Sequence, residues 1–290
     1  MSRAHEPCRT PSILKQYAYM NVRQVFQNKN ARLARLLPGF IYRYLERIVH
    51  QEGINDFLER HGHLYGVDFA RAAIEEFNIS MEVKGTENLP KDRRCIFASN
   101  HPYGGFDGIL LMDLMSRYYP GFKFLSNDIL MNIDNLVPLF LPVNKHGKQG
   151  VESAARLHEA YLSDMQIVTF PAGLVSRRIN GQIIDLEWKK NFITKAVHYK
   201  RDIIPVHCTG RNSSFFYRLA NLRRFLKIKA NIEMLYLVDE TWKHKNEKVT
   251  VTFGKPIPYT TFDRTKTPAQ WAKWVKEQVY ALAGIYNVPF

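Results

Sequence analysis

CIFASNHPYGGFDG, residues 95–108, is the stretch that decides the fold of this 290-residue chain. Its first four residues form an uninterrupted apolar run, which is typical of a buried strand. A polar, glycine-rich turn follows and leads into the apolar run 109–112, which indicates the start of a helix. We therefore predict a strand–turn–helix unit whose turn carries His101 and Asp107. In open α/β sheets, this position at the carboxyl end of a strand is where ligands bind.

Strand-like and helical segments alternate on both sides of this unit, from about residue 80 onward. The alternation predicts an α/β domain at residues 80–290, with a mostly parallel mixed sheet flanked by helices. The predicted strands are Met81–Lys84, Cys95–Ser99, Lys123–Leu125, Leu139–Val143, Gln166–Phe170, Ile203–His207 and Val249–Phe253. The predicted helices are Gly108–Tyr118, Gly150–Leu162, Trp188–Tyr199, Ser213–Leu226 and Pro268–Leu282.

Residues 1–79 have a different character, and we predict that they form an N-terminal helical segment. Between residues 30 and 50, apolar side chains recur every three or four positions with arginines between them. This pattern predicts a basic amphipathic helix that is interrupted at Pro38-Gly39. Such helices bind membrane surfaces, so we expect the segment to associate with a membrane; the alternative is that its apolar stripe packs on the α/β domain. Further helices are expected at Ile54–His61 and Phe69–Phe77, whereas residues 1–30 show little periodicity.

The net charge and the cysteines limit the possible partners and cofactors. Lys and Arg number 41 against 27 Asp and Glu, and the net charge of +14 predicts an anionic partner: a nucleic acid, an anionic bilayer or a phosphorylated small molecule. The three cysteines are widely spaced and form no CxxC pair, which argues against a disulfide framework or a thiolate zinc site. His61-Gly62-His63 has no further ligand nearby, so we predict no metal.

Two further absences in the sequence bear on location. The first residues, MSRAHEPCRTPS, contain no apolar stretch of the kind found in signal peptides. No segment approaches the roughly 20 apolar residues needed to span a bilayer. We therefore expect a soluble or peripheral protein rather than an integral membrane protein.

The turn at residues 99–108 holds the candidate catalytic residues. Gly104-Gly105 allows the backbone to bend so that Asp107 can approach His101. An imidazole with one nitrogen held by a carboxylate can act as a general base toward a hydroxyl group through the other nitrogen. The simpler alternative is that Asp107 caps a helix and His101 is a polar turn residue.

Four sequence blocks favour the catalytic interpretation: NHPYGGFD at 100–107, FLPVNK at 140–145, FPAGLVS at 170–176 and IIPV at 203–206. Together they resemble the glycerolipid acyltransferase superfamily of 1-acylglycerol-3-phosphate acyltransferases and their relatives. The resemblance covers roughly residues 80–260. The His-x5-Asp spacing resembles a hemolysin-like subgroup, which includes O-acyltransferases that make ornithine and glycine aminolipids; most of the superfamily has His-x4-Asp.

The resemblance implies roles for further residues within these blocks. Ala172 and Val175 stand where the superfamily has the glutamate and arginine implicated in binding a glycerol phosphate head group. We therefore expect a lysolipid acceptor with a different head group, and our hypothesis is an amino-acid lipid. Arg177 and Arg178 could hold its carboxylate or phosphate, although a paired charge in a turn is as often a solvated surface feature. The other candidate substrate-binding residues are Asn100, Lys145, Gly173 and Ser176.

The implied activity is transfer of a fatty acyl group from acyl-CoA or acyl carrier protein to a lysolipid hydroxyl, with the thioester as co-substrate and no other cofactor. His101 would be the general base and Asp107 would orient it. The partners would be the lysolipid, the acyl donor and an anionic membrane surface, and the location would be the cytoplasmic face of a bacterial cell membrane.

Three alternatives remain open. The chain could be a lysophosphatidic acid acyltransferase of phospholipid synthesis, or a non-catalytic membrane-binding relative with the same fold. A nucleic-acid-binding protein is suggested by the charge alone, and no RNP, helix-turn-helix or zinc-finger signature supports it.

Overall fold

A seven-stranded sheet forms the centre of the protein, whose computed structural model describes residues 19–29, 31–126, 133–143 and 148–285. The strand order is β1-β9-β8-β2-β5-β3-β4. Neighbouring strands are parallel except for β8 and β9, which are antiparallel. The predicted class, a mostly parallel mixed sheet flanked by helices, is confirmed. The strands are β1 (Ser80–Lys84), β2 (Cys95–Ser99), β3 (Phe122–Ser126), β4 (Phe140–Pro142), β5 (Gln166–Thr169), β8 (Asp202–Cys208) and β9 (Lys248–Phe253).

Helices cover both faces of this sheet. Side chains alternate between the two faces along each strand, and both faces carry apolar side chains that must be buried. In β2, Phe97 belongs to the core on one face, whereas Ile96 and Ala98 belong to the core on the other. The central strands are buried on both sides, which explains their uninterrupted apolar sequences. The first face is covered by α5 (Val67–Glu76) and α6 (Gly105–Tyr118), and the second by α7 (Lys148–Leu162), α8 (Asn191–Tyr199) and α11 (Pro268–Ala281).

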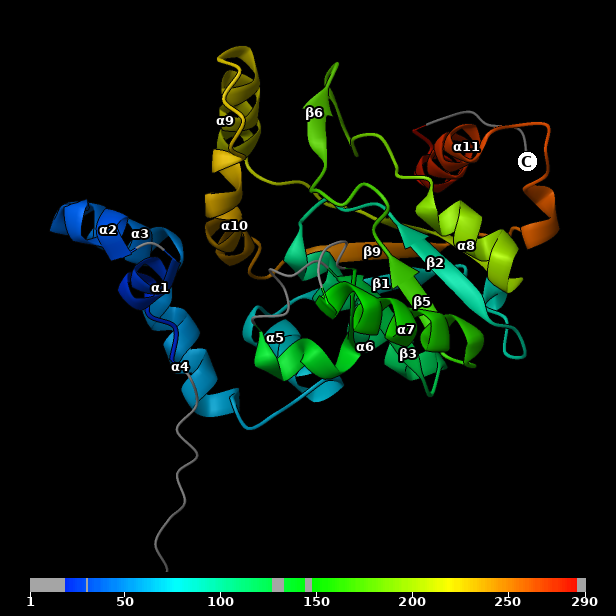
Figure 1. Ribbon diagram of the computed structural model, residues 1–290, viewed down its shortest axis with the longest axis horizontal. Helices are drawn as coiled ribbons and strands as arrows, with labels where there is room; N and C mark the ends of the chain where they lie inside the picture. The colour runs from blue at the N-terminus through cyan, green and yellow to red at the C-terminus, as the bar shows by residue number, and fades with distance from the viewer. Residues whose placement is uncertain (1–18, 30, 127–132, 144–147, 286–290) are drawn as a thin grey trace, which may run out of the picture.

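The helices at the N-terminal end stand beside the sheet and away from its centre (Figure 1). The predicted interruption at Pro38 is confirmed, since one helix ends before it and the next begins after it. His50 is one of the residues that attach the segment: its ring stacks on that of Trp242 with 4.6 Å between centroids, and its Nε2 lies 2.9 Å from an Asp239 carboxylate oxygen. Phe57 and Leu58 of the same segment pack against the core. The described part of the chain contains no helix both long and apolar enough to cross a membrane. These helices are α1 (Val22–Lys29), α2 (Ala31–Leu36), α3 (Gly39–Ile48) and α4 (Gln51–His61).

A hairpin and a pair of helices stand at the edge of the sheet where the parallel strands end (Figure 1). Of these elements, only the helix at 213–226 was predicted from the sequence. A short antiparallel hairpin follows β5, and a helical pair follows β8. The hairpin consists of β6 (Arg177–Ile179) and β7 (Gln182–Ile184), and the helical pair of α9 (Ser214–Phe225) and α10 (Leu237–Lys243), with the 3₁₀ helix Ile232–Tyr236 between them.

Candidate active site

Three chain segments meet where β2, β5 and β8 end, because these neighbouring strands are parallel and finish at one edge of the sheet (Figure 1). Asn100 joins the loop after β2 to the end of β8: its side-chain amide donates to the Cys208 carbonyl at 2.9 Å and accepts from the Cys208 N–H at 2.7 Å. The Ser176 N–H, in the segment after β5, donates to the His101 carbonyl at 2.8 Å. The backbone around His101 is therefore fixed from both sides.

His101 and Asp107 lie together in this site. The His101 Nδ1 is 3.0 Å from the Asp107 Oδ2. That distance suits a hydrogen bond, although the two groups are not aligned for one. Asp107 is fully buried, and the same oxygen accepts the backbone N–H groups of Tyr103 and Gly104, each at 2.9 Å. Burial raises the pKa of the Asp107 carboxyl, while His101 and the two N–H groups act in the opposite direction by stabilising its ionised form.

The imidazole is held from a second direction by an aromatic ring. The Phe170 ring stacks on that of His101, with 4.2 Å between centroids and 26° between planes. Only 15% of the His101 side chain is exposed. With Nδ1 turned toward Asp107, Nε2 is the nitrogen left for a substrate. Such a half-enclosed, oriented imidazole suits proton transfer with a hydroxyl group.

The turn between His101 and Asp107 requires a glycine at position 104. Gly104 has φ of +92°, and a Cβ atom there would lie 2.9 Å from a methyl carbon of Val175. Helix α6 begins immediately after it, so Asp107 sits in the first turn, where the helix N-terminus favours a negative charge. The sequence Gly104-Gly105 thus brings the carboxylate back to the imidazole.

Asp185 is a buried residue of the site that the sequence analysis did not identify. Its Oδ1 accepts hydrogen bonds from the His101 backbone N–H at 3.2 Å and from the Ser176 hydroxyl at 2.6 Å. Its Oδ2 accepts one from the Trp188 indole N–H at 2.8 Å. Three segments are therefore held by one carboxylate. No motif identifies Asp185, and its only sequence signal is an acidic residue between two apolar ones in IIDLEW, residues 183–188.

The structure separates the two arginines at 177 and 178. Arg177 is buried, pairs with the buried Glu233 at 2.8 Å and donates to the Val175 carbonyl at 2.6 Å. A guanidinium with these partners stabilises the fold and has little capacity left for a substrate. Arg178 is half-buried, and its guanidinium lies over the Tyr217 ring, 5.4 Å from the ring centroid. This contact leaves its N–H groups available, so Arg178 is a better candidate than Arg177 for binding an anion.

The remaining candidates have distinct surroundings. Gly173 is exposed in the turn after β5, with φ of +66°. Ser176 is buried against Asp185, and Asn100 uses its amide on β8, so both hold backbone in place. Lys145 lies outside the described residues.

Neither Cys95 nor Cys208 is suited to nucleophilic catalysis. Burial raises the pKa of Cys95 to about 12, and it raises the pKa of Cys208 further, so both thiols stay protonated. Within the described ranges, no group of three or more His, Cys, Asp or Glu side chains is arranged to hold a metal ion. The only acid–base pair of the proposed kind in the turn is His101 with Asp107.

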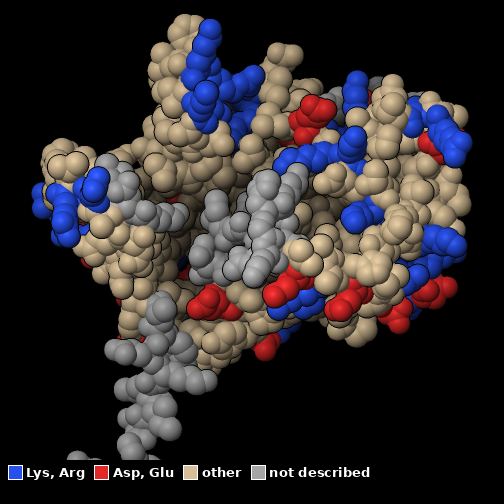
Figure 2. All heavy atoms as spheres, viewed as in Figure 1, with Lys and Arg blue, Asp and Glu red and all other residues tan. Residues whose placement is uncertain are grey.

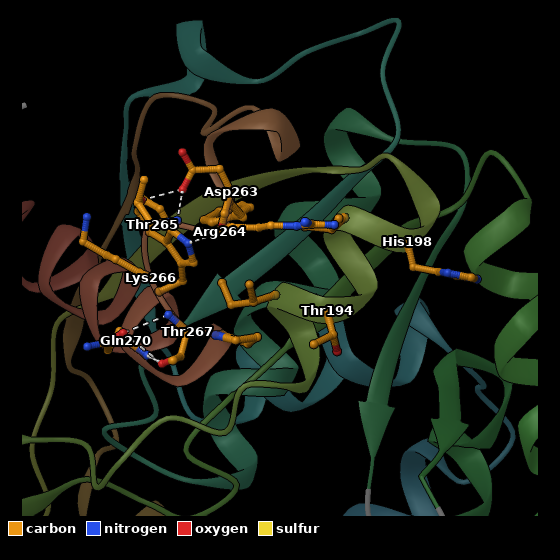
Figure 3. A pocket seen from close by; sticks show the side chains of 13 residues that line it. Thr194, His198, Asp263, Arg264, Thr265, Lys266, Thr267 and Gln270 are labelled. Atoms are coloured by element: carbon orange, nitrogen blue, oxygen red, sulfur yellow. Dashed lines mark hydrogen bonds between the residues drawn. The ribbon is translucent and has the colours of Figure 1, made fainter.

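A surface pocket of about 630 Å³ lies elsewhere, between α8 and the segment 262–271 (Figure 3). Thr194, His198 and Arg264 are among its lining residues. None of the residues that contact His101 or Asp107 lines it. The pocket is therefore separate from the candidate active site.

Comparison with known proteins places the chain among enzymes. The model of the family described as Acyltransferase matches residues 24–287. A lyso-glycine lipid O-acyltransferase of Bacteroides thetaiotaomicron is 50% identical over 264 residues, which is 91% of this chain and 97% of that protein. A lyso-glycine lipid O-acyltransferase of Phocaeicola vulgatus is 47% identical and covers 91% and 95%. The crystal structure of the 1-acyl-sn-glycerophosphate acyltransferase PlsC from Thermotoga maritima matches 92% of this chain and 100% of that one, with 18% identity and a TM-score of 0.47.

Proposed function

The chain belongs to the acyltransferase family, and we propose that it moves a fatty acyl group from a thioester donor to the hydroxyl group of a lyso-glycine lipid. The family resemblance noted in the sequence blocks is confirmed, and the chain is an O-acyltransferase of lysolipids. The glycine head group is taken from the two relatives at about 50% identity. The observation that carries the chemistry is the contact between the His101 Nδ1 and the buried Asp107 carboxylate.

The reaction would begin with His101 Nε2 accepting the proton of the acceptor hydroxyl. The oxygen attacks the thioester carbonyl, and the tetrahedral intermediate collapses with cleavage of the C–S bond. The leaving thiolate takes the proton back from the imidazolium, so the products are an ester and a free thiol. Asp107 stabilises the imidazolium while it carries that proton.

The head-group preference is supported by the segment after β5. Ala172 and Val175 are both buried, and Val175 packs against Phe216 and Tyr217 of α9. Positions at which the superfamily has a charged pair for glycerol phosphate thus hold apolar contacts here. Arg178, at the rim of the same segment, would bind the acceptor's anionic group.

The N-terminal helices support a membrane location for this enzyme. In α2 and α3, Leu36 and Phe40 are exposed, and Arg32, Arg35 and Arg43 are exposed beside them. An apolar stripe flanked by cations suits the surface of an anionic leaflet, where the lysolipid resides. The +14 charge would also attract acyl-CoA or acyl carrier protein, since both are acidic.

Acyl transfer in detergent micelles, read by mass spectrometry, tests the proposal. Acyl-CoA and acyl carrier protein are each supplied with lyso-glycine lipid or lysophosphatidic acid, and wild type is compared with His101→Ala. His198→Ala is the matched control, because this exposed histidine lines the separate pocket on α8 (Figure 3).

We expect the wild type and His198→Ala to make diacyl glycine lipid and His101→Ala to lose at least about 10²-fold in rate. Equal rates for wild type and His101→Ala would refute the general-base role. Preference for lysophosphatidic acid would refute the proposed head group, and absence of product with both acceptors would favour the non-catalytic alternative.

A further inference from the structure

The free end of α9 exposes a cluster of apolar side chains, which we call the α9 tip: Leu222, Phe225, Leu226 and Ile228. Phe225 is 81% exposed, the highest value among the large apolar residues described, and the other three are exposed as well. Every residue from Arg224 to Asn231 is exposed. Figure 1 shows α9 projecting from the body of the molecule. A contiguous apolar patch on such a projection indicates an interaction surface.

The α9 tip is a folded turn, so its side chains are held outward by structure. The N–H groups of Lys227 and Ile228 bond the carbonyls of Arg224 and Arg223, which ends the helix. The Arg223 guanidinium donates to the Ile228 carbonyl at 3.0 Å and pairs with the buried Glu233 at 2.8 Å. The turn is thus anchored by an internal ion pair.

Only positive charges accompany these apolar residues. Residues 211–231 contain six Arg and Lys and no Asp or Glu. Figure 2 shows basic side chains gathered at the end of the α9 projection. Arg224, Lys227 and Lys229 are exposed within the turn itself. Apolar side chains that project outward with cations around them match the surface of an anionic lipid bilayer.

We propose that the α9 tip inserts into the interface of an anionic bilayer and positions the active site over it. This inference rests on the proposed function, because a lysolipid acceptor is drawn from that bilayer. The α9 tip would be a second docking element, about 180 residues from α2 and α3 in the chain and outside the amphipathic segment at residues 30–50.

The base of α9 is attached to the candidate active site, so docking of the tip fixes the orientation of the site. Just before the helix, the Asn212 side chain donates to the Pro102 carbonyl at 3.1 Å. Phe216 and Tyr217, in its first turn, pack on Val175 in the segment after β5. A bilayer that holds the tip therefore also holds the turn that carries His101.

Vesicle co-sedimentation of the full chain tests this proposal. Wild type is compared with Phe225→Ser/Leu226→Ser and with Arg224→Gln/Lys227→Gln, on phosphatidylcholine vesicles with and without phosphatidylglycerol. Val151→Ser is the matched control, because Val151 is 74% exposed on α7. All variants change exposed residues, and equal thermal midpoints would establish that they fold.

We expect the apolar double variant to partition about 100-fold less onto anionic vesicles, at about tenfold for each side chain removed. The charge variant should lose about 30-fold on anionic vesicles and nothing on neutral ones. Val151→Ser should bind as wild type. Wild-type partitioning of both tip variants would overturn the proposal.

Acyl transfer in detergent micelles separates this proposal from the proposed function. The tip variants should transfer with acyl-CoA at wild-type rates in micelles and lose activity only on vesicles. If none of the proteins transfers an acyl group while vesicle binding depends on the tip, the docking proposal stands and the enzymatic one fails. If the tip variants bind vesicles normally and lose only the reaction with acyl carrier protein, the surface is assigned to that acidic protein instead.

Discussion

Replacement of Asp185 by Asn tests whether one buried carboxylate positions the catalytic turn. Asp185 accepts three hydrogen bonds, from the His101 N–H, the Ser176 hydroxyl and the Trp188 indole. Asn has the same shape but only one acceptor oxygen. In the better of its two orientations, the amide oxygen still accepts the hydrogen bonds from the His101 backbone N–H and the Ser176 hydroxyl. The amide NH₂ group then faces the Trp188 indole N–H, which loses its acceptor.

The cost of this change follows from those contacts. One buried donor without an acceptor costs about 1–3 kcal/mol, and the two remaining hydrogen bonds lose the strength that the negative charge gave them, about 1 kcal/mol each. We expect Asp185→Asn to lower the free energy of unfolding by about 3–5 kcal/mol. Because one of the two weakened hydrogen bonds holds the His101 backbone, kcat should also fall by about 10- to 100-fold, with little change in KM for the lysolipid.

Urea unfolding and steady-state kinetics measure both effects, and Asp113→Asn is the matched control. Asp113 is a buried carboxylate of α6 that contacts Arg71 at 3.2 Å and Arg117 at 2.5 Å, and it contacts none of the site residues. It should lose stability without a fall in kcat per folded molecule. If Asp185→Asn also keeps its full kcat per folded molecule, Asp185 contributes to folding alone and the positioning argument is refuted.

Three other predictions concern backbone strain, pH and a buried ion pair. Gly104→Ala should destabilise the fold by about 1–3 kcal/mol or more, because its φ of +92° disfavours a side chain and its Cβ would crowd Val175; thermal unfolding measures this. Burial lowers the pKa of His207 to about 4 from 6.5, so the unfolded chain binds this proton first, and about 3 kcal/mol of stability should be lost as pH falls from 7 to 4. His207→Phe should flatten that part of the pH profile of urea unfolding, and an unchanged profile would contradict the assignment. Glu233→Gln should cost about 3–5 kcal/mol, because it removes the charge that faces Arg177 and Arg223 in the interior; a loss below 1 kcal/mol would show that the pair contributes little.

The sequence predicted the centre of the sheet well because β2, β5 and β8 are buried on both faces. All seven predicted strands correspond to observed ones, and β2 was predicted with its observed bounds, Cys95–Ser99. Continuous apolar runs give this signal without an alignment. The shorter elements gave no such signal. β6 and β7 have three residues each and α10 has seven, which is too few to establish a periodicity. Helix α1 was missed because residues 22–29 are mostly polar.

The candidate site was partly predictable for a local reason. His101 and Asp107 lie in one turn, and Gly104 between them allows the backbone to bring their side chains to 3.0 Å. Asp185 is 84 residues from His101, and Glu233 is 56 residues from Arg177. Contacts over such separations depend on the tertiary fold, so neither the positioning carboxylate nor the burial of Arg177 could be read from spacing. The membrane role of residues 1–79 stays a prediction.

The place of β9 in the sheet has a consequence for how the chain is made. β9 is the last strand in the sequence, yet it lies between β1 and β8 and pairs with both. Contacts beside β1 join residues as far apart as Asn78 and Asn246, which are 168 residues from each other. At typical synthesis rates of about 5–20 residues per second, β1 waits on the order of ten to thirty seconds on the ribosome for β9, the strand with which it pairs. β1 presents an unpaired edge throughout that interval, and β8 does so from its own synthesis until that of β9; such edges are the kind of surface that recruits foreign strands. Completion of the sheet is therefore a late event in synthesis, and a nascent chain that has not yet emerged past β9 is the form of this protein most in need of a chaperone.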